Sequence, residues 1–597
     1  MKLDKMTGLK RTRYCGEVTA DDLNTTVTVC GWAARQRDLG QLIFIDLRDR
    51  TGILQLAFDD CTDSAVFEKA FAVRSEFVLM AKGTVRRRSS VNAELKTGEL
   101  ELFVQDLRIL GTAQTPPFEV LDSTKAKDEL RLKYRYLDLR RPKLQQNIML
   151  RHRIAKAARD FFDQNGFLEI ETPTLIKSTP EGARDYLVPS RVHQGAFYAL
   201  PQSPQLYKQL LMLSGFDRYV QLARCYRDED LRADRQPEFT QIDLEMSFVE
   251  MEDVLQIGEQ FVKYLFKTVL GEEIAEPIER MKYNDAMENY GSDKPDVRFE
   301  MKLRDLSDLV ADCDFGVFAN AVKTGGTVRC ITAKNAAAVL TRKEIDRLTE
   351  YVRGIGAKGL AFVRWAEQEP SCSFAKFLTK EQFAAVLERA GAEQGDVVLI
   401  VADRKSTALS TLGALRLEVA RKLNIIPNVN KFLWITEFPF FELDEETGTY
   451  NAMHHPFTAP LDECVQFLDS APEKVYAKAY DLVLNGVELS SGSIRITDPE
   501  LQQKMFAALG LSSQEAEEKF GFLVNAFKYG APPHGGMGLG LDRLVMLMSQ
   551  SESLRDVIAF PKVQNASELM SGAPAEVDPQ QLQELAIAVT PSNKDQA

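Results

Sequence analysis

Two segments carry residues that could bind a polyphosphate. In the segment 219–248, a strand followed by a charged loop and a second strand would form a hairpin, and alternate side chains of a strand share a face. One face of the second strand then holds Phe239, Gln241, Asp243 and Glu245. Arg227 and Glu229 share a face at the mouth of the hairpin, where a guanidinium could clamp a phosphate with two hydrogen bonds. An edge hairpin with cross-strand ion pairs explains the same residues equally well.

The other segment is 479–496, which contains two carboxylates and an arginine. Asp481 and Glu488 could bracket a divalent cation through oxygen ligands, which suits Mg²⁺ on a polyphosphate. Arg495 follows the small residues Ser-Ser-Gly-Ser. The alternative is a strand with solvated carboxylates and an arginine in a salt bridge.

A glycine-rich stretch, 531–548, precedes an apolar helix with Arg543 near its start. Its glycines permit a close backbone approach, but no Gly-Lys-Ser/Thr follows and the dinucleotide fingerprint is absent. By itself the stretch favours a tight structural turn.

A short helix and a histidine pair could bind an acidic substrate. Ser203 suits a helix N-cap and Pro204 the first helical position, so Gln205 and Lys208 would share a face near the start of that helix. A capped surface helix with a solvated lysine is the alternative. His454 and His455 could contact an acidic substrate or form a buried hydrogen-bonded pair.

The elements that must position these residues fall into several domains. Residues 13–110 contain short runs of β character separated by turns, which predicts a small barrel or sandwich. From about 128 the sequence has long amphipathic stretches alternating with strands, including a helix over 147–166 and a strand over 167–176 that runs into Pro173. Residues 297–430 look like an inserted domain, and the end of the chain is a tail with one short helix.

Composition limits the class of protein. The chain has 597 residues, several times a typical domain of about 150. Its net charge of −13 argues against a broadly cationic surface but does not exclude a local nucleic-acid site. Its eight cysteines are scattered without a CxxC pair, and no apolar run approaches the ~20 residues of a membrane span. We expect a reduced, cytoplasmic protein with no membrane association and no structural zinc.

Together these segments resemble the class II aminoacyl-tRNA synthetases. GFLEIETPTL (166–175) resembles motif 1 of that family, YRDED (226–230) with EFTQIDLE (238–245) resembles motif 2, and GLGLDR (538–543) resembles motif 3. Four longer stretches are most similar to the bacterial aspartyl-tRNA synthetases: 131–142, 179–191, 200–212 and 227–243.

The resemblance implies a multidomain α+β fold. It comprises an N-terminal OB-fold β-barrel that binds the anticodon, which 31–50 resembles, and an antiparallel-sheet catalytic domain with an inserted α+β domain. The expected boundaries are 1–117 for the OB-fold, 118–296 and 431–566 for the two parts of the catalytic domain, 297–430 for the insertion, and 567–597 for a C-terminal extension.

The resemblance also implies roles for individual residues. Arg227 and Arg543 would be catalytic. The expected ATP-binding residues are Arg227, Asp228, Glu229, Gln236, Phe239, Glu488, Gly540, Leu541, Asp542 and Arg543, with Asp481 and Glu488 as Mg²⁺ ligands. The expected aspartate-binding residues are Glu181, Gln205, Lys208, Arg227, Asp243, His454, His455 and Arg495, and those for the anticodon are Arg37, Phe44 and Gln55.

The implied reaction joins L-aspartate to the 3′ end of tRNA-Asp through an aspartyl-adenylate, in a homodimer. The alternatives are a relaxed enzyme that also charges tRNA-Asn, an asparaginyl or lysyl relative, and a catalytically silent RNA-binding paralogue. Lys208 with Arg495 and the long insertion speak against the second alternative, and the complete set of motif residues speaks against the third. Leu39, where some relaxed relatives have histidine, favours strict recognition of tRNA-Asp.

Overall fold

The computed structural model describes residues 2–179, 183–229, 235–274, 277–443 and 450–590. The chain forms two compact units. The first contains Met1–Arg153, Asp230–Pro237 and Val545–Leu582, and the second contains Ile154–Glu229, Glu238–Leu544 and Gln583–Ala597.

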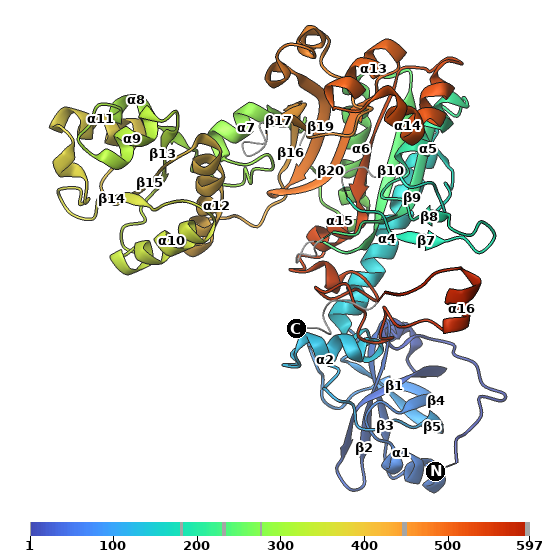
Figure 1. Cartoon of the computed structure of the whole chain (residues 1–597). Helices are drawn as coiled ribbons and strands as arrows, with labels where there is room; N and C mark the ends of the chain where they lie inside the picture. Colours follow the sequence, from blue (N-terminus) through green and yellow to red (C-terminus); the bar gives the residue numbers. More distant parts are fainter. Residues whose placement is uncertain (1, 180–182, 230–234, 275–276, 444–449, 591–597) are drawn as a thin grey trace. The chain divides into compact units, whose positions relative to one another are not determined.

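A closed five-stranded barrel, at the blue end of the chain in Figure 1, dominates the first unit. Its strands are β1 (Thr26–Asp38), β2 (Ile43–Asp49), β3 (Gly52–Phe58), β4 (Val78–Arg87) and β5 (Leu100–Gly111), in the order β1-β2-β3-β5-β4. A parallel pairing of β3 with β5 and the pairing of β1 with β4 close it. Alternate residues such as Ile43, Ile45 and Leu47 fill its interior, which is the packing that period-two patterning predicts.

Helices complete the first unit. They are α1 (Ser64–Ala72), α2 (Asp128–Lys133), α3 (Arg135–Asp138), the start of α4 (Pro142–Gln164) and most of α16 (Pro579–Glu584). Asp138 is fully buried and pairs with Arg135 and Arg141 at 2.8 Å each. Arg135 also donates to the carbonyls of Ile558 and Ala559 at 2.9 Å, so this charged cluster ties the helices to the 554–560 segment.

An eight-stranded sheet forms the centre of the second unit. Its order is β11-β16-β19-β20-β21-β10-β9-β6, and its pairs are antiparallel except β11–β16 and β6–β9 at the edges. The strands are β6 (Leu168–Glu169), β9 (Arg218–Tyr226), β10 (Glu238–Ser247), β11 (Glu279–Lys282), β16 (Phe432–Pro439), β19 (Tyr476–Leu484), β20 (Val487–Ile494) and β21 (His534–Gly540). Two small hairpins accompany it, β7 (Leu187–Pro189) with β8 (Phe197–Ala199) and β17 (Phe441–Leu443) with β18 (Tyr450–Ala452).

Helix α6 (Met251–Leu270) packs on one face of this sheet (Figure 1). A Cβ on its Gly258 would lie 3.1 Å from both Met537 Sδ and the ring of Trp434, so glycine allows the close approach. The other helices around the sheet are the end of α4, α5 (Gln205–Leu213), α7 (Tyr283–Tyr290), α13 (Pro499–Ala508), α14 (Ser513–Phe527) and α15 (Leu541–Met548). The face opposite α6 is called the front face below.

The inserted segment has its own sheet and two apolar cores. Its strands are β12 (Arg304–Asp305), β13 (Thr327–Ala333), β14 (Ala361–Arg364) and β15 (Val397–Asp403), in the antiparallel order β12-β13-β15-β14. Its helices are α8 (Ser307–Val310), α9 (Gly316–Lys323), α10 (Arg342–Gly354), α11 (Lys380–Ala390) and α12 (Lys405–Leu423). The α+β insertion expected from the sequence is therefore confirmed as a fold.

Three local expectations differ from the structure. The helix expected over 147–166 begins earlier, at Pro142, where proline suits a first helical turn. The strand expected over 167–176 forms a ladder only at Leu168 and Glu169, with one further bridge from Ile176 to Ala199. Between them lies Pro173, which lacks the N–H that a ladder needs. The glycine-rich stretch is not a tight turn but strand β21, whose glycines let neighbouring side chains approach its backbone.

Candidate active site

Strand register assembles the floor of the site on the front face. Asp243 pairs with Gly538 of β21, which pairs with Ser491 of β20, which pairs with Asp481 of β19. One row along, Glu245 pairs with Gly536, which pairs with Ser493. Directly paired residues of neighbouring strands point to the same face. The alternation predicted from the sequence is thus confirmed, and it brings together residues far apart in the chain.

A buried group of four charges occupies this floor. The ammonium of Lys208 lies 2.9 Å from Asp243 Oδ1 and 3.2 Å from Glu245 Oε2. Arg495 holds Glu245 with two hydrogen bonds, from Nε at 2.8 Å and from Nη2 at 3.0 Å. All four side chains are almost completely buried, so each charge depends on its partners rather than on water.

The two carboxyls of this group titrate differently. Burial raises the pKa of Asp243 to about 6, although Lys208 opposes the shift. Burial acts in the same direction on Glu245, but the charges of Arg495 and Lys208 outweigh it and hold its pKa at about 2. Glu245 is therefore a permanent anion between two cations, while Asp243 can change its protonation near pH 6.

The glycines of β21 make room for these carboxylates. A Cβ on Gly536 would lie 2.1 Å from Glu245 Oε2 and 2.1 Å from the Leu244 carbonyl. A Cβ on Gly538 would lie 3.3 Å from Asp243 Oδ1. A side chain at Gly536 would force a shift of Glu245 and of the β10 backbone, so that position requires glycine.

Two neutral histidines border the charged group. Arg495 Nη1 lies 2.7 Å from His455 Nε2, and since arginine can only donate, this nitrogen accepts. Burial and the charge of Arg495 lower the pKa of His455 well below its ordinary value. Burial also lowers the pKa of His454, to about 4. Both rings are therefore uncharged at pH 7.

Several buried polar atoms of the site have no hydrogen-bond partner among the described residues. They are Gln205 Nε2, Asp243 Oδ2, His454 Nε2 and Asp481 Oδ1. An unpaired buried polar atom costs about 1–3 kcal/mol, and such atoms in a native protein point to a missing partner. All four belong to residues expected from the sequence to bind aspartate or metal.

The acid pair expected to hold a metal lies on β19 and β20. The pairing of β19 with β20 has a β-bulge between Leu482 and Val483. On one side of it Asp481 pairs with Ser491, and on the other Val483 pairs with Glu488. Burial and the nearby Glu488 raise the pKa of Asp481 well above its ordinary value. Arg543 donates to the Glu488 carbonyl at 2.6 Å, and its Nη1 lies 3.9 Å from Glu488 Oε1. Two repelling carboxylates with an unpaired oxygen fit a divalent cation.

The expected nucleotide residues of the second unit lie on this sheet or directly after its strands β9 and β21. The guanidinium of Arg227 lies over the ring of Phe239, 5.0 Å from its centroid. The Asp228 amide donates to the Arg184 carbonyl at 3.1 Å, and Glu229 ends the described part of this loop. Asp542 is buried and its carboxylate accepts the Thr240 amide at 2.9 Å, so it fastens β10 to the start of α15.

The remaining expected residues are placed as follows. Gly540 ends β21 and Leu541 begins α15, where Leu541 is buried. Gln236 belongs to the first unit, and both ends of its amide bond the backbone of Lys562, at 3.1 and 2.8 Å. Glu181 lies outside the described residues.

The expected anticodon residues lie together on the barrel of the first unit. Arg37 pairs with Phe44 across β1 and β2, and its guanidinium lies 5.8 Å from the ring centroid. Arg37 also donates to Gln55 Oε1 at 2.9 Å. Gln55 is buried and donates in turn to Glu101, whereas Leu39, at the tip of the β1–β2 hairpin, is 68% exposed.

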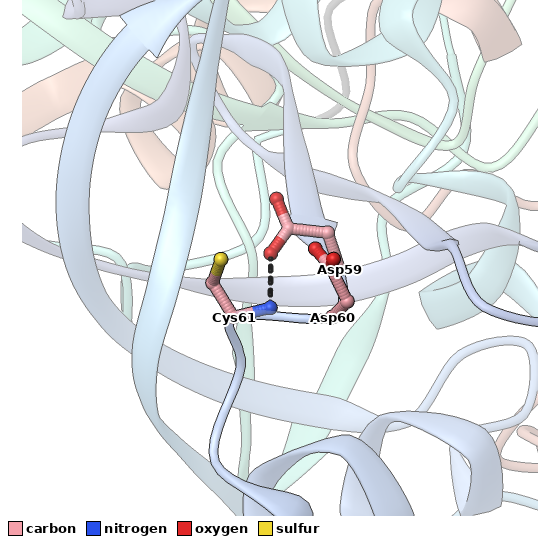
Figure 2. Close-up of side chains that lie close together, drawn as sticks. All are labelled: Asp59, Asp60 and Cys61. Atoms are coloured by element: carbon pink, nitrogen blue, oxygen red, sulfur yellow. Dashed lines mark hydrogen bonds between the residues drawn. The ribbon is translucent and has the colours of Figure 1, made fainter.

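One further cluster in the first unit resembles a metal site only superficially. Asp59, Asp60 and Cys61 lie close together after β3 (Figure 2). Asp59 accepts a hydrogen bond from the Cys61 amide at 3.0 Å and pairs with Arg86 at 3.0 Å, so its carboxylate stabilises the turn after β3.

No helix among the described residues is long and apolar enough to cross a membrane.

Glu245 is the important residue that the site expected from the sequence omits. Strand alternation puts it on the same face as Asp243, and this was the available signal. Its role as the shared partner of Lys208 and Arg495 was not visible, because these residues are far apart in the chain.

Comparison with known proteins agrees with this geometry. Residues 127–564 match the family model described as tRNA synthetases class II (D, K and N), and residues 27–110 match an OB-fold nucleic acid binding domain. An asparaginyl-tRNA synthetase from Pyrococcus horikoshii has a similar fold, with a TM-score of 0.58 and 19% identity over 96% of this chain and all of that one. An aspartyl tRNA synthetase from Entamoeba histolytica has a TM-score of 0.57 and 19% identity over 94% of each chain. The chain therefore belongs to the class II tRNA synthetases.

Sequence similarity narrows the class further. The chain is 58% identical to an aspartate–tRNA ligase from Ruminiclostridium cellulolyticum over 98% of each chain. It is 55% identical to an aspartate–tRNA(Asp/Asn) ligase from Thermoanaerobacter pseudethanolicus, over 98% of this chain and 99% of that one. The chain is an aspartate–tRNA ligase, which uses ATP to join aspartate to tRNA-Asp through an aspartyl-adenylate.

Proposed function

We propose that the front face of the eight-stranded sheet forms the aspartyl-adenylate, with aspartate over the four buried charges and ATP beside Arg227. The observation that carries this proposal is that two buried side-chain atoms of the site, Gln205 Nε2 and Asp243 Oδ2, have no partner among the described residues. The open acceptor of Asp243, beside Lys208, suits the ammonium group of an amino acid substrate.

Aspartate is recognised by charge. Lys208 and Arg495 bind its side-chain carboxylate, Asp243, Gln205 and Glu181 surround its ammonium group, and Arg227, His454 and His455 complete the pocket. Asparagine is rejected because its neutral amide would leave the charge of Lys208 and Arg495 without an added counter-ion. Because both histidines are uncharged at pH 7, they add no positive charge to the pocket that Lys208 and Arg495 already make cationic.

ATP is held by the residues around motifs 2 and 3. Arg227 binds the α-phosphate, Phe239 stacks on adenine, and Arg543 covers the other face or the γ-phosphate. The remaining contacts come from Asp228, Glu229, Glu488, Gly540, Leu541 and Asp542. Asp481 and Glu488 are the groups that hold Mg²⁺, which when bound neutralises charge on the phosphates.

The chemical step needs positioned charge and no protein nucleophile. The aspartate α-carboxylate attacks the α-phosphorus of ATP, and pyrophosphate leaves. Arg227 and Arg543 stabilise the anionic transition state, and their fixed positions remove the cost of reorganising solvent. The tRNA 3′ terminus then takes the aspartyl group from the mixed anhydride.

Substitution of Arg227 tests this assignment. Arg227→Ala should abolish aspartate-dependent ATP–pyrophosphate exchange. Arg224→Ala is the matched control, because Arg224 lies on β9, which ends just before Arg227, but donates to Thr240 on the face opposite Phe239. If Arg227→Ala exchanged pyrophosphate at the rate of the control, the assignment of the phosphate clamp would be wrong.

The barrel residues expected at the anticodon indicate how the tRNA would be bound. Arg37, Phe44 and Gln55 contact anticodon bases, where stacking on aromatic rings is the usual mode of single-strand recognition. Because Leu39 lies at the exposed hairpin tip, we propose strict recognition of tRNA-Asp. The alternative is that tRNA-Asn is charged as well, as the name of the relative from Thermoanaerobacter pseudethanolicus indicates for that protein.

We also propose a cytoplasmic homodimer assembled through motif 1, and a monomeric mass in light scattering at micromolar concentration would contradict it.

A further inference from the structure

One loop outside the residues assigned above reaches the acid pair of β19 and β20. It follows α7 and contains Asp293 and Lys294 in the sequence Tyr-Gly-Ser-Asp-Lys-Pro-Asp. Lys294 Nζ lies 3.9 Å from Glu488 Oε2 and 3.6 Å from Asp293 Oδ1. Its side chain is 44% exposed, so the ammonium group remains accessible to a ligand.

The loop is held firmly in this place. A Cβ on Gly291, which has φ +65°, would lie 2.1 Å from the Leu409 carbonyl. Asp296 is buried, and Arg298 holds its carboxylate with Nη2–Oδ2 at 2.7 Å. A Cβ on Gly486, in the turn before Glu488, would lie 3.0 Å from Asp296 Cβ. The loop therefore packs on the turn that positions Glu488, and Lys294 is preorganised beside it.

Charges around the acid pair are arranged for an anionic ligand as well as for a cation. Arg543 approaches Glu488 Oε1 and Lys294 approaches Oε2, each at 3.9 Å. The distance from Lys294 is longer than a hydrogen bond, so its ammonium group keeps hydrogen-bonding capacity for another partner, whereas Arg543 Nη1 already donates to the Glu488 carbonyl. A triphosphate bound beside Asp481 and Glu488 would lie within reach of both.

We propose that Lys294 binds the pyrophosphate part of ATP. In the free enzyme its ammonium group faces Glu488, and in the complex it donates to β- and γ-phosphate oxygens. This inference rests on the proposed role of Asp481 and Glu488. In the reaction a bond forms between an aspartate α-carboxylate oxygen and the α-phosphorus, and the bond from that phosphorus to the bridging oxygen breaks. The electron pair stays on the departing pyrophosphate, and Lys294 stabilises the charge that develops there.

Three variants test the inference. Lys294→Met removes the charge, Lys294→Arg keeps it, and Lys478→Met is the control, because Lys478 on β19 pairs with Asp462 at 2.7 Å, outside the residues assigned to the site. KM values for ATP and for aspartate come from pyrophosphate exchange, and the Kd of pyrophosphate with Mg²⁺ comes from calorimetry on the full chain. Thermal unfolding checks that each variant is folded.

We expect Lys294→Met to raise the KM for ATP and the Kd of pyrophosphate about 10- to 100-fold, the range for losing a hydrogen bond to a charged group. The KM for aspartate should not change, Lys294→Arg should recover most of the loss, and Lys478→Met should behave as the wild type.

The inference is overturned if Lys294→Met leaves pyrophosphate binding unchanged or tightens it. Tighter binding would mean that Lys294 only neutralises Glu488 and competes with the metal. Glu488→Gln separates this failure from failure of the proposed function. If Glu488→Gln abolishes exchange while Lys294→Met does not weaken pyrophosphate binding, the acid pair stands and only the role of Lys294 is wrong. If Glu488→Gln exchanges normally, the acid pair is wrong and the basis for Lys294 falls with it.

Discussion

Replacing Glu245 by glutamine should destabilise the catalytic sheet by a calculable amount. The pKa of Glu245 is held at about 2 against an ordinary 4.5, and each pKa unit corresponds to about 1.4 kcal/mol. The ionised carboxylate thus contributes about 3 kcal/mol at neutral pH. Removing one partner of a buried ion pair typically costs about 3–5 kcal/mol, because the remaining charge is left uncompensated. Here Lys208 and Arg495 would share only Asp243.

The assay should report on the sheet and not on the whole chain. Hydrogen exchange of peptides from β10 and β21, measured against urea at pH 7, gives the free energy of opening of these strands. The control is Glu252→Gln on α6, because Glu252 forms an ion pair with Arg280 in which the two side chains are 44% and 40% exposed. Glu245→Gln should lower the opening free energy by about 3 kcal/mol, and the control by less than about 1 kcal/mol.

The pH dependence of stability tests separately whether ionised Glu245 stabilises the sheet. Because the folded-state pKa of Glu245 is lowered, its contribution is fully present above pH 4.5 and is lost as the pH falls toward 2. The difference between wild type and Glu245→Gln should therefore narrow over that interval. Equal stability of the two proteins at pH 7, or a difference that widens on acidification, would show that ionised Glu245 does not stabilise the sheet.

Three other perturbations follow from the site. Because the pKa of Asp243 is about 6 and a protonated carboxyl cannot pair with an ammonium group, the KM for aspartate should rise as the pH falls below 6, and a pH-independent KM would contradict this role. Gly536→Ala should destabilise the sheet by about 1–3 kcal/mol and raise the KM for aspartate, because the new Cβ would lie 2.1 Å from Glu245 Oε2. A melting temperature and a KM equal to those of the wild type would show that Gly536 is packed less tightly than this distance implies. Phe239→Leu should raise the KM for ATP about 5- to 100-fold through lost stacking, and an equal rise in the KM for aspartate would argue for general disruption.

Much of the site follows from local sequence rules. Period-two alternation in 238–247 puts Phe239, Asp243 and Glu245 on one face, and the strand register confirms it. The N-cap rule finds the start of α5 within a residue, since Pro204 is the N-cap and Ser203 Oγ accepts the Gln205 amide at 3.4 Å.

What the sequence does not reveal depends on long-range partners. The glycines of 531–548 suggest a turn when considered alone, and the strand is evident only from the pairing of β21 with β10 and β20. Likewise, Gln236 offers an amide for a nucleotide, yet Lys562 already engages both ends of it, 326 residues further along the chain. Contacts of this kind depend on tertiary packing, which no local pattern encodes.

Charging of tRNA is the direct test of the aspartate–tRNA ligase activity and of its tRNA specificity. Labelled aspartate, ATP and Mg²⁺ should be incubated with the full chain and with transcripts of tRNA-Asp and tRNA-Asn side by side, with labelled asparagine as the control amino acid. We expect aspartate to be joined to tRNA-Asp alone and asparagine to be joined to neither transcript. Charging of both transcripts with aspartate would contradict the strict recognition proposed from Leu39. Failure to charge tRNA-Asp would contradict the assignment of the chain as an aspartate–tRNA ligase.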